Sequence, residues 1–247
     1  MKSKACVLGM GIVAALAASS AAAYEAGDII VRAGSVSVDP DGGSSGIALP
    51  ALGIAPLAGT HTQVDSDTQL GLSLTYMLSD WLGVELLAAT PFSHAIGANL
   101  MAVGLGAIQA GATKHLPPTL SLVWYPLDRG SVVSPYVGAG INYTVFFDES
   151  AHADLERAAG ALAGLDGPVP MSLKLEDSVG LAAQVGVDLA LSERWHLNVA
   201  VRWIDIETKA TFKARDGSAI AAGTTIARID DVDIDPWVYQ VNIGYRF

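Results

Sequence analysis

The chain ends in a run of alternating side chains that needs an apolar surface beside it. Its last eleven residues, WVYQVNIGYRF (237–247), carry an aromatic or β-branched side chain at every second position. Alternate side chains of a strand point to opposite faces, so one face is apolar and the other is polar. Chain ends are usually frayed and polar. The pattern therefore indicates either packing on a core or a strand with lipid outside and a polar lumen inside.

The N-terminal segment has the pattern of an export signal. Two lysines precede an apolar run over 5–18, and alanines at 21–23 supply small residues for cleavage before Tyr24. This predicts a cleaved secretory signal peptide over residues 1–23, with an uncleaved signal anchor as the alternative. Cys6, the only cysteine, would leave with the signal, so the mature chain is expected to have no disulfide.

The charge and hydropathy of the remaining chain narrow its class. Without Lys2 and Lys4 the chain keeps 12 of its 14 basic side chains against 25 acidic ones. This excess of negative charge makes nucleic acid an unsuitable partner. We find no linker, and so expect one domain over residues 24–247. Mean hydropathy is +0.40, yet no uninterrupted apolar run of about 18 residues follows the signal. The hydrophobicity of an exported chain without a membrane helix needs another explanation.

Alternation of period two recurs along the chain and supplies that explanation. Short turns (79–80, 126–131, 192–194) alternate with long connections (39–67, 91–117, 148–177, 205–235). This favours an all-β fold, an eight-stranded antiparallel transmembrane β-barrel with short periplasmic turns and long extracellular loops, over a soluble β-sandwich. The predicted strands are residues 28–38, 68–77, 82–89, 118–125, 136–145, 179–189, 195–203 and 237–247.

Several stretches, taken together and in order, carry a family resemblance. They are TQLGLSLTYM (68–77), VELLAATPF (84–92), HLPPTL (115–120), PYVGAGINYTVFF (135–147), QVGVD (184–188), DPWV (235–238) and GYRF (244–247). In these the chain resembles the outer-membrane protein W family. The resemblance implies a porin-like barrel in the outer membrane of Gram-negative bacteria, in contact with lipid and lipopolysaccharide. It also implies a narrow apolar channel for passive uptake of small hydrophobic solutes, with lateral exit through the wall as one route. Phe247 resembles the terminal signal read by the barrel assembly machinery.

Beyond Trp203 the two faces of the seventh strand exchange their chemistry. Charged side chains such as Glu207, Lys209 and Lys213 take the outward phase, and acidic residues at 231, 233 and 235 do the same on the returning strand. Since Pro236 stands where a calcium loop needs glycine, we interpret these acids as a solvated wall. The inward side chains form either a closing core or an apolar vestibule, and the apolar segments 46–59 and 98–112 favour the vestibule. They are Ile204, Ile206, Phe212, Val232 and Ile234.

A constriction is predicted lower in the lumen. Strand phase turns Leu87 inward, and the resemblance implies an apolar gate residue there. Arg202 also turns inward, where related sequences carry an aromatic residue, and it needs a buried acidic partner, either Glu85 or Asp188. Gate and static ion pair both remain open. With Arg32 and Arg246 also facing inward, the alternative is a structural, adhesive or receptor barrel with a plugged lumen.

No pattern in the sequence indicates catalysis. Ser93 and His94 are adjacent, and three further histidines lie in predicted loops, but no acid partner or metal-ligand spacing accompanies them. We expect no catalytic residues, no cofactor and no metal, and therefore not an enzyme.

Overall fold

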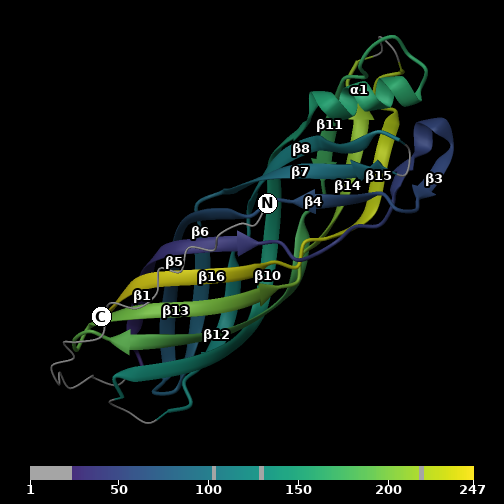
Figure 1. The fold of residues 1–247 in the computed structure, drawn as a ribbon. Coiled ribbons are helices and arrows are strands. Elements are labelled where there is room, and N and C mark those ends of the chain that lie inside the picture. The colour runs from purple at the N-terminus through teal and green to yellow at the C-terminus, as the bar shows by residue number, and fades with distance from the viewer. Residues whose placement is uncertain (1–23, 102–103, 128–130, 217–219) are drawn as a thin grey trace, which may run out of the picture.

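Eight antiparallel strands close into a barrel (Figure 1). The computed structural model describes residues 24–101, 104–127, 131–216 and 220–247, so the predicted signal peptide lies outside the described residues. The wall runs in chain order, and its last strand pairs with its first. The eight-stranded prediction is confirmed. The wall strands are β1 (Ile29–Asp39), β5 (Asp67–Ser79), β6 (Leu82–Ala89), β9 (Thr119–Trp124), β10 (Val133–Ala151), β12 (Ser178–Ala190), β13 (Trp195–Ile204) and β16 (Trp237–Arg246).

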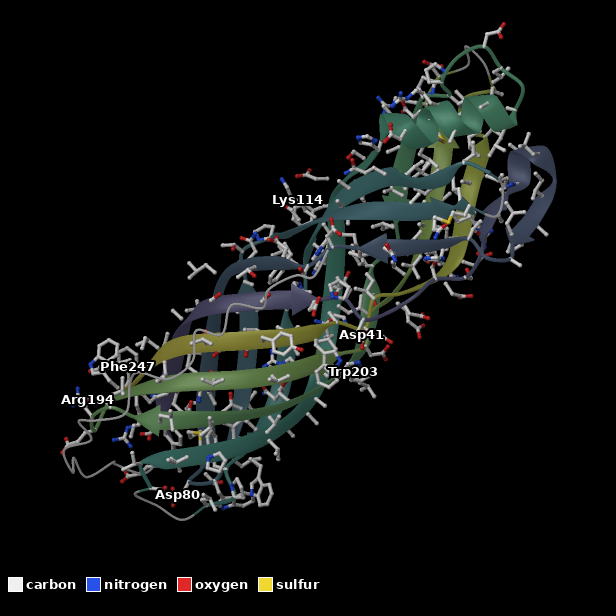
Figure 2. The ribbon with its side chains drawn as sticks, viewed as in Figure 1. Asp41, Asp80, Lys114, Arg194, Trp203 and Phe247 are labelled. Atoms are coloured by element: carbon white, nitrogen blue, oxygen red, sulfur yellow. The ribbon has the colours of Figure 1, made fainter. Side chains whose placement is uncertain are left out.

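The barrel wall is apolar outside and mostly polar inside. In β5, Leu70, Leu72 and Leu74 are exposed, whereas the alternating Ser73 and Thr75 are buried. Aromatic side chains flank the apolar band, and Figure 2 shows Trp203 and Phe247 at its two ends. One flank holds Tyr143, Trp203 and Trp237, and the other holds Trp81, Trp124, Trp195, Tyr245 and Phe247. This is the arrangement expected of a wall that faces lipid.

The four long connections lie where predicted, and each of them contains at least one further strand. Strand β10 continues beyond the barrel and pairs with β8 (Gly106–Leu116), which joins β7 (Phe92–Leu100) and β4 (His61–Val64). A second sheet follows the order β11 (Met171–Leu175), β14 (Glu207–Ala214), β15 (Thr225–Asp233), β2 (Ile47–Leu49) and β3 (Ile54–Leu57). The two sheets form an extension at one end of the barrel (Figure 1).

The helical elements lie in this extension. The 3-10 helix η1 (Pro50–Leu52) joins β2 to β3, and α1 (Ala153–Leu162) covers the tip. His152 caps α1 by accepting a hydrogen bond from the backbone N–H of Asp154. In the part of the chain that the structure describes, no helix has the length and apolarity to span a membrane.

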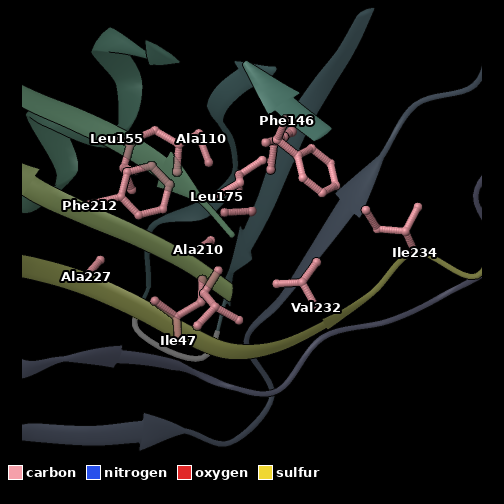
Figure 3. Packing of buried hydrophobic residues seen from close by; sticks show 14 of the residues in the cluster. Ile47, Ala110, Phe146, Leu155, Leu175, Ala210, Phe212, Ala227, Val232 and Ile234 are labelled. Atoms are coloured by element: carbon pink, nitrogen blue, oxygen red, sulfur yellow. The ribbon is translucent and has the colours of Figure 1, made fainter. Parts of the chain in front are cut away.

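The extension is held together by an apolar core between its two sheets (Figure 3). Phe212, Val232 and Ile234 are buried in it, while Lys209 and Lys213 are exposed on the opposite face. The predicted exchange of faces beyond Trp203 is therefore confirmed. The reason is that side chains keep alternating between the two faces while the surroundings of each face change. The outer face passes from lipid to water, and the inner face passes from polar groups to an apolar core.

Close approach of two strands requires glycine at position 34. A Cβ atom placed on Gly34 would lie 2.1 Å from the carbonyl oxygen of Val241, in the partner strand β16. Gly43 lies in a connection, and a Cβ there would meet nothing within 4 Å.

We expect Gly34→Ala to destabilise the barrel by about 1–3 kcal/mol, because the β1–β16 seam must move apart. The measurement is the temperature at which the folded band disappears on gels of samples heated in steps. Gly43→Ala is the matched control and should melt like the wild type. Equal melting of both variants would contradict the close-packed seam.

A charge-paired lumen below an apolar chamber

Arg32 stands at the centre of the lumen and joins strands that are distant in the wall. Its Nη1 donates to Glu85 Oε2 at 3.0 Å and to Thr75 Oγ1 at 2.9 Å. Its Nη2 donates to Asp188 Oδ2 and to the Tyr125 hydroxyl, both at 2.8 Å. Arg32 is 1% exposed. One side chain of β1 thus ties the opposite carboxylates of β6 and β12 together.

A second guanidinium completes the charge balance. Arg202 Nη2 donates to Glu85 Oε1 at 2.7 Å and to Gln184 Oε1 at 2.6 Å, and Gln184 Nε2 donates to Glu85 Oε1 at 2.9 Å. Asp188 also accepts from Asn198 Nδ2 at 2.8 Å. Two guanidiniums therefore face two carboxylates in an interior that an eight-stranded barrel leaves just wide enough for side chains. We call Arg32, Glu85, Gln184, Asp188, Asn198 and Arg202 the lumen network.

The side chains that face the lumen change from polar to apolar between one residue and the next on the same strand face. On β13, Arg202 is followed on the same face by buried Ile204, and on β6, Glu85 is followed by buried Leu87. On β16, Val238 lies one step beyond Gln240 in the same direction. The lumen network is thus the floor of an apolar region, and Leu87 lies at the boundary.

Above this floor the extension encloses an apolar cavity of about 30 Å³. We call it the chamber. Phe212, Val232 and Ile234 line it, and Ile204 and Ile206 lie in the same buried cluster. A cavity of this volume has room for about two water molecules, so the side chains predicted for the vestibule fill most of it themselves. The five side chains therefore lie in a packed core around a small cavity, and admission of apolar solutes to that cavity stays a prediction.

Backbone pairing in the wall is interrupted beside the chamber. The β6–β9 ladder ends at the pair Leu87–Thr119, and the β7–β8 ladder begins at Phe92–His115. Within these described residues, no ladder pairing joins 88–91 to 116–118. Proline, which has no N–H to donate, occupies positions 91, 117 and 118. Asn142 Nδ2 donates to the carbonyls of Pro117 and Pro118 at 3.1 and 3.2 Å, which fixes this segment from the lumen side.

Two stacked histidines lie among the residues that line the chamber. His94 of β7 and His115 of β8 stack with ring centroids 4.8 Å apart, and both are 3% exposed. Burial lowers the pKa of His94, and it lowers the pKa of His115 to about 3, with the neighbouring His94 adding to the effect. Both rings lie above the level of Tyr143 and are neutral at pH 7.

The structure brings some of the predicted site residues together. Of the two candidate partners for Arg202, Glu85 forms the ion pair and Asp188 pairs with Arg32 instead. Arg246 lies at the end of the barrel near Asp28, with 3.5 Å between Nη1 and Oδ2. Sequence reasoning missed the stacked histidines, because it placed both in loops. The alternation of Phe92, His94 and Ile96 was the signal that could have placed them on an inward strand face.

Comparisons with known proteins agree with this architecture. A sequence model described as "OmpW family" matches residues 25–247. This chain belongs to the OmpW family. It is 44% identical over 245 residues to outer membrane protein W of Vibrio cholerae serotype O1, covering 99% of this chain and 100% of that protein. The crystal structure of OprG from Pseudomonas aeruginosa matches with a TM-score of 0.76 at 41% identity, covering 91% of this chain and 98% of that one.

More distant relatives extend the comparison. The dibenzothiophene metabolism operon protein PahQ of Pseudomonas aeruginosa is 25% identical over 190 residues, covering 76% of each chain. The solid-state NMR structure of outer membrane protein AlkL shares the fold, with a TM-score of 0.59 at 22% identity, covering 100% of this chain and 97% of that one.

Membership of the OmpW family shows where this protein is located and to which class of protein it belongs. The protein is a non-enzymatic barrel of the bacterial outer membrane, with lipid around its apolar band. In the described ranges, no group of three or more histidine, cysteine, aspartate or glutamate side chains is arranged to hold a metal ion.

We expect Glu85→Gln to destabilise the barrel by about 3–5 kcal/mol, because two buried guanidiniums then share only Asp188. Melting of the folded band on gels measures the effect. Ser73→Ala, an uncharged inward position at the same level of the wall, is the control. Equal melting of the two variants would contradict a charge-balanced lumen.

We also expect the His115 ring to stay neutral on acidification to pH 5. Its pKa of about 3 lies below that of an exposed histidine, near 6.5, so the folded state binds fewer protons than the unfolded state between these values. Stability from this group is therefore full above about pH 6.5 and is lost as pH falls toward 3. Side-chain NMR titration of the His115 ring measures its protonation. A midpoint for His115 near 6.5 would contradict its burial.

Proposed function

We propose that this protein mediates passive uptake of small hydrophobic molecules, which enter the chamber from outside and leave sideways through the wall into the membrane. The observation that carries the proposal is an apolar chamber with a closed polar floor. An apolar solute gains by leaving water for the chamber. To continue along the barrel axis it would have to separate the buried ion pairs of Arg32 and Arg202, which is costly.

The interrupted ladder offers the alternative way out. Residues 88–91 and 116–118 lie at the end of β6 and the start of β9, beside chamber residues His115 and Phe146. No ladder hydrogen bond has to break for these two stretches to move apart, since 88–90 bond to β5 and 116–118 bond to β10 on their other sides. PahQ supports the same class of solute, because its name connects it to the metabolism of dibenzothiophene, an apolar aromatic compound.

The second candidate is a structural, adhesive or receptor barrel with no transport. The lumen network favours it, since the network closes the axis, and the chamber is small as it stands. In either case we propose lipopolysaccharide as a contact of the outer wall and the barrel assembly machinery as the reader of Phe247. Only the uptake measurement separates the two candidates.

The test places a large side chain beside the interrupted ladder. Ala89 packs against the apolar core, whereas the neighbouring Ala88 faces outward. We expect Ala89→Trp to reduce uptake of an alkane such as octane at least several-fold, while Ala88→Trp leaves it unchanged. Cells without the protein set the baseline, and a pentose serves as the hydrophilic solute. Equal octane uptake in cells with and without the protein would favour the receptor candidate.

The constriction residues distinguish axial from lateral passage. If Leu87 and Arg202 form a gate along the axis, Leu87→Ala should widen it and Arg202→Trp should obstruct it. In the lateral route both form the floor, so octane uptake should be unchanged in folded Leu87→Ala and ion conductance in planar bilayers should stay low. A clear rise in octane uptake with Leu87→Ala would overturn the lateral route.

A further inference from the structure

A cleft of about 300 Å³ opens on the side of the extension, next to the chamber of about 30 Å³. Pockets that bind small molecules measure about 300–1,000 Å³, so the cleft has room for a solute that the chamber does not. We call it the side cleft. Three segments line it, which are residues 40–43 after β1, residues 62–65 at the end of β4 and residues 232–234 at the end of β15.

The side cleft begins directly above the outer aromatic side chains of the barrel. Asp39, the last residue of β1, pairs with Trp237, which pairs in turn with Trp203. The lining of the cleft starts at the next residue, Pro40. Figure 2 shows Asp41 just beyond Trp203, toward the extension. A solute at the outer surface of the membrane can therefore reach the cleft without crossing the apolar band.

One layer of side chains separates the side cleft from the chamber. The residues that line both cavities are Thr62, Val64, Val232 and Ile234, which we call the partition. Three of the four are valine or isoleucine, so an apolar solute that settles against the partition buries its own apolar surface there. The same residues then meet it on the chamber side.

No strand ladder closes the wall across the side cleft. β4 is an edge strand that pairs with β7 on one side. On the other side, the backbone N–H of Thr62 donates to Ser44 Oγ at 2.8 Å. Among the described residues, no ladder pairing joins 62–65 to 232–234. The partition can therefore open between β4 and β15 while both strands keep their ladder partners.

The charged side chains that line the side cleft are all acidic. Asp41, Asp65 and Asp233 are exposed there, and its described lining includes no lysine, arginine or histidine. A cleft lined by charges of one sign concentrates their field, so it repels solutes of the same sign. Anions are therefore disfavoured in the side cleft, whereas uncharged solutes meet no such barrier.

We propose that the side cleft is the first binding site of small uncharged apolar solutes on their way to the chamber, and that it excludes the corresponding anions. The inference rests on the proposed uptake function and names its entrance and the charge of its substrates. β4 forms one edge of the sheet β10–β8–β7–β4, whereas the proposed exit lies beside β8 and β10. Solutes then enter and leave the chamber on different sides.

Gly43 offers a position at which the side cleft can be blocked after the protein has folded. It lines the cleft, and a Cβ atom there meets nothing within 4 Å. The test uses Gly43→Cys, to which benzyl methanethiosulfonate attaches a benzylthio group that dithiothreitol removes. Gly167→Cys is the matched control, because a Cβ at Gly167 also meets nothing within 4 Å and Gly167 does not line the cleft. Treated wild type controls for other thiols, and mass spectrometry confirms labelling.

We expect labelling of Gly43→Cys to reduce octane uptake by cells several-fold and dithiothreitol to restore it, with no change in labelled Gly167→Cys. Unchanged uptake in fully labelled Gly43→Cys, in cells whose octane uptake depends on the protein, would overturn the entrance. Octane uptake that is equal with and without the protein overturns the proposed function instead, and binding to the purified protein then tests the side cleft by itself.

The binding measurement compares 1-octanol with octanoate, which is ionised at pH 7, on protein in nanodiscs of zwitterionic lipid. The difference between unlabelled and labelled Gly43→Cys isolates binding in the cleft from partitioning into lipid. We expect this difference for octanol and not for octanoate. Replacing two carboxylates together, Asp41→Asn with Asp65→Asn, should raise octanoate binding at least about twofold and leave octanol binding unchanged. Octanol binding that labelling does not alter would overturn the site, and octanoate binding as strong as that of octanol in the wild type would overturn the exclusion of anions.

Discussion

Compensation of buried charge is the constraint on which the rest of this barrel depends. An eight-stranded interior has room for side chains and little else, so Arg32 and Arg202 could not lie there without carboxylates within hydrogen-bonding distance. Glu85 bridges both guanidiniums, and Asp188 completes the balance. The same contacts that make the charges tolerable also close the barrel axis. The same ion pairs therefore stabilise the wall and close the lumen.

The chamber above follows from continuing the strands out of the membrane without changing their phase. Side chains that point outward meet lipid below Trp203 and water above it, so leucine and valine give way to lysine and glutamate. Inward side chains change in the opposite sense, from Arg202 to Ile204 within one step. A polar floor and an apolar chamber thus meet at a sharp boundary, and a solute that suits one does not suit the other. This contrast is the physical basis for the proposed sideways route.

Two departures from regularity mark where such a route would act. Prolines at 91, 117 and 118 coincide with the interruption between two ladders, so the seam between 88–91 and 116–118 lacks ladder hydrogen bonds, while each side stays bonded to its other neighbour. Close to it, the stacked rings of His94 and His115 line the chamber, where every other lining residue is a threonine or has an apolar side chain. Regular pairing supplies a stable barrel, and these local exceptions lie where the proposed route would pass.

The sequence by itself determined the strands, their inward and outward faces and the exchange of faces beyond Trp203, because side-chain alternation is a local property that can be read residue by residue. It also required an acid for Arg202. It could not choose between Glu85 and Asp188, because β6 and β13 lie on opposite sides of the barrel and meet only once closure and register are set. The same holds for His94 and His115, which became a stacked pair only through β7–β8 pairing in a segment that looked like a loop. Cross-strand register depends on hydrogen bonds between distant parts of the chain, and that is what only the tertiary structure decided.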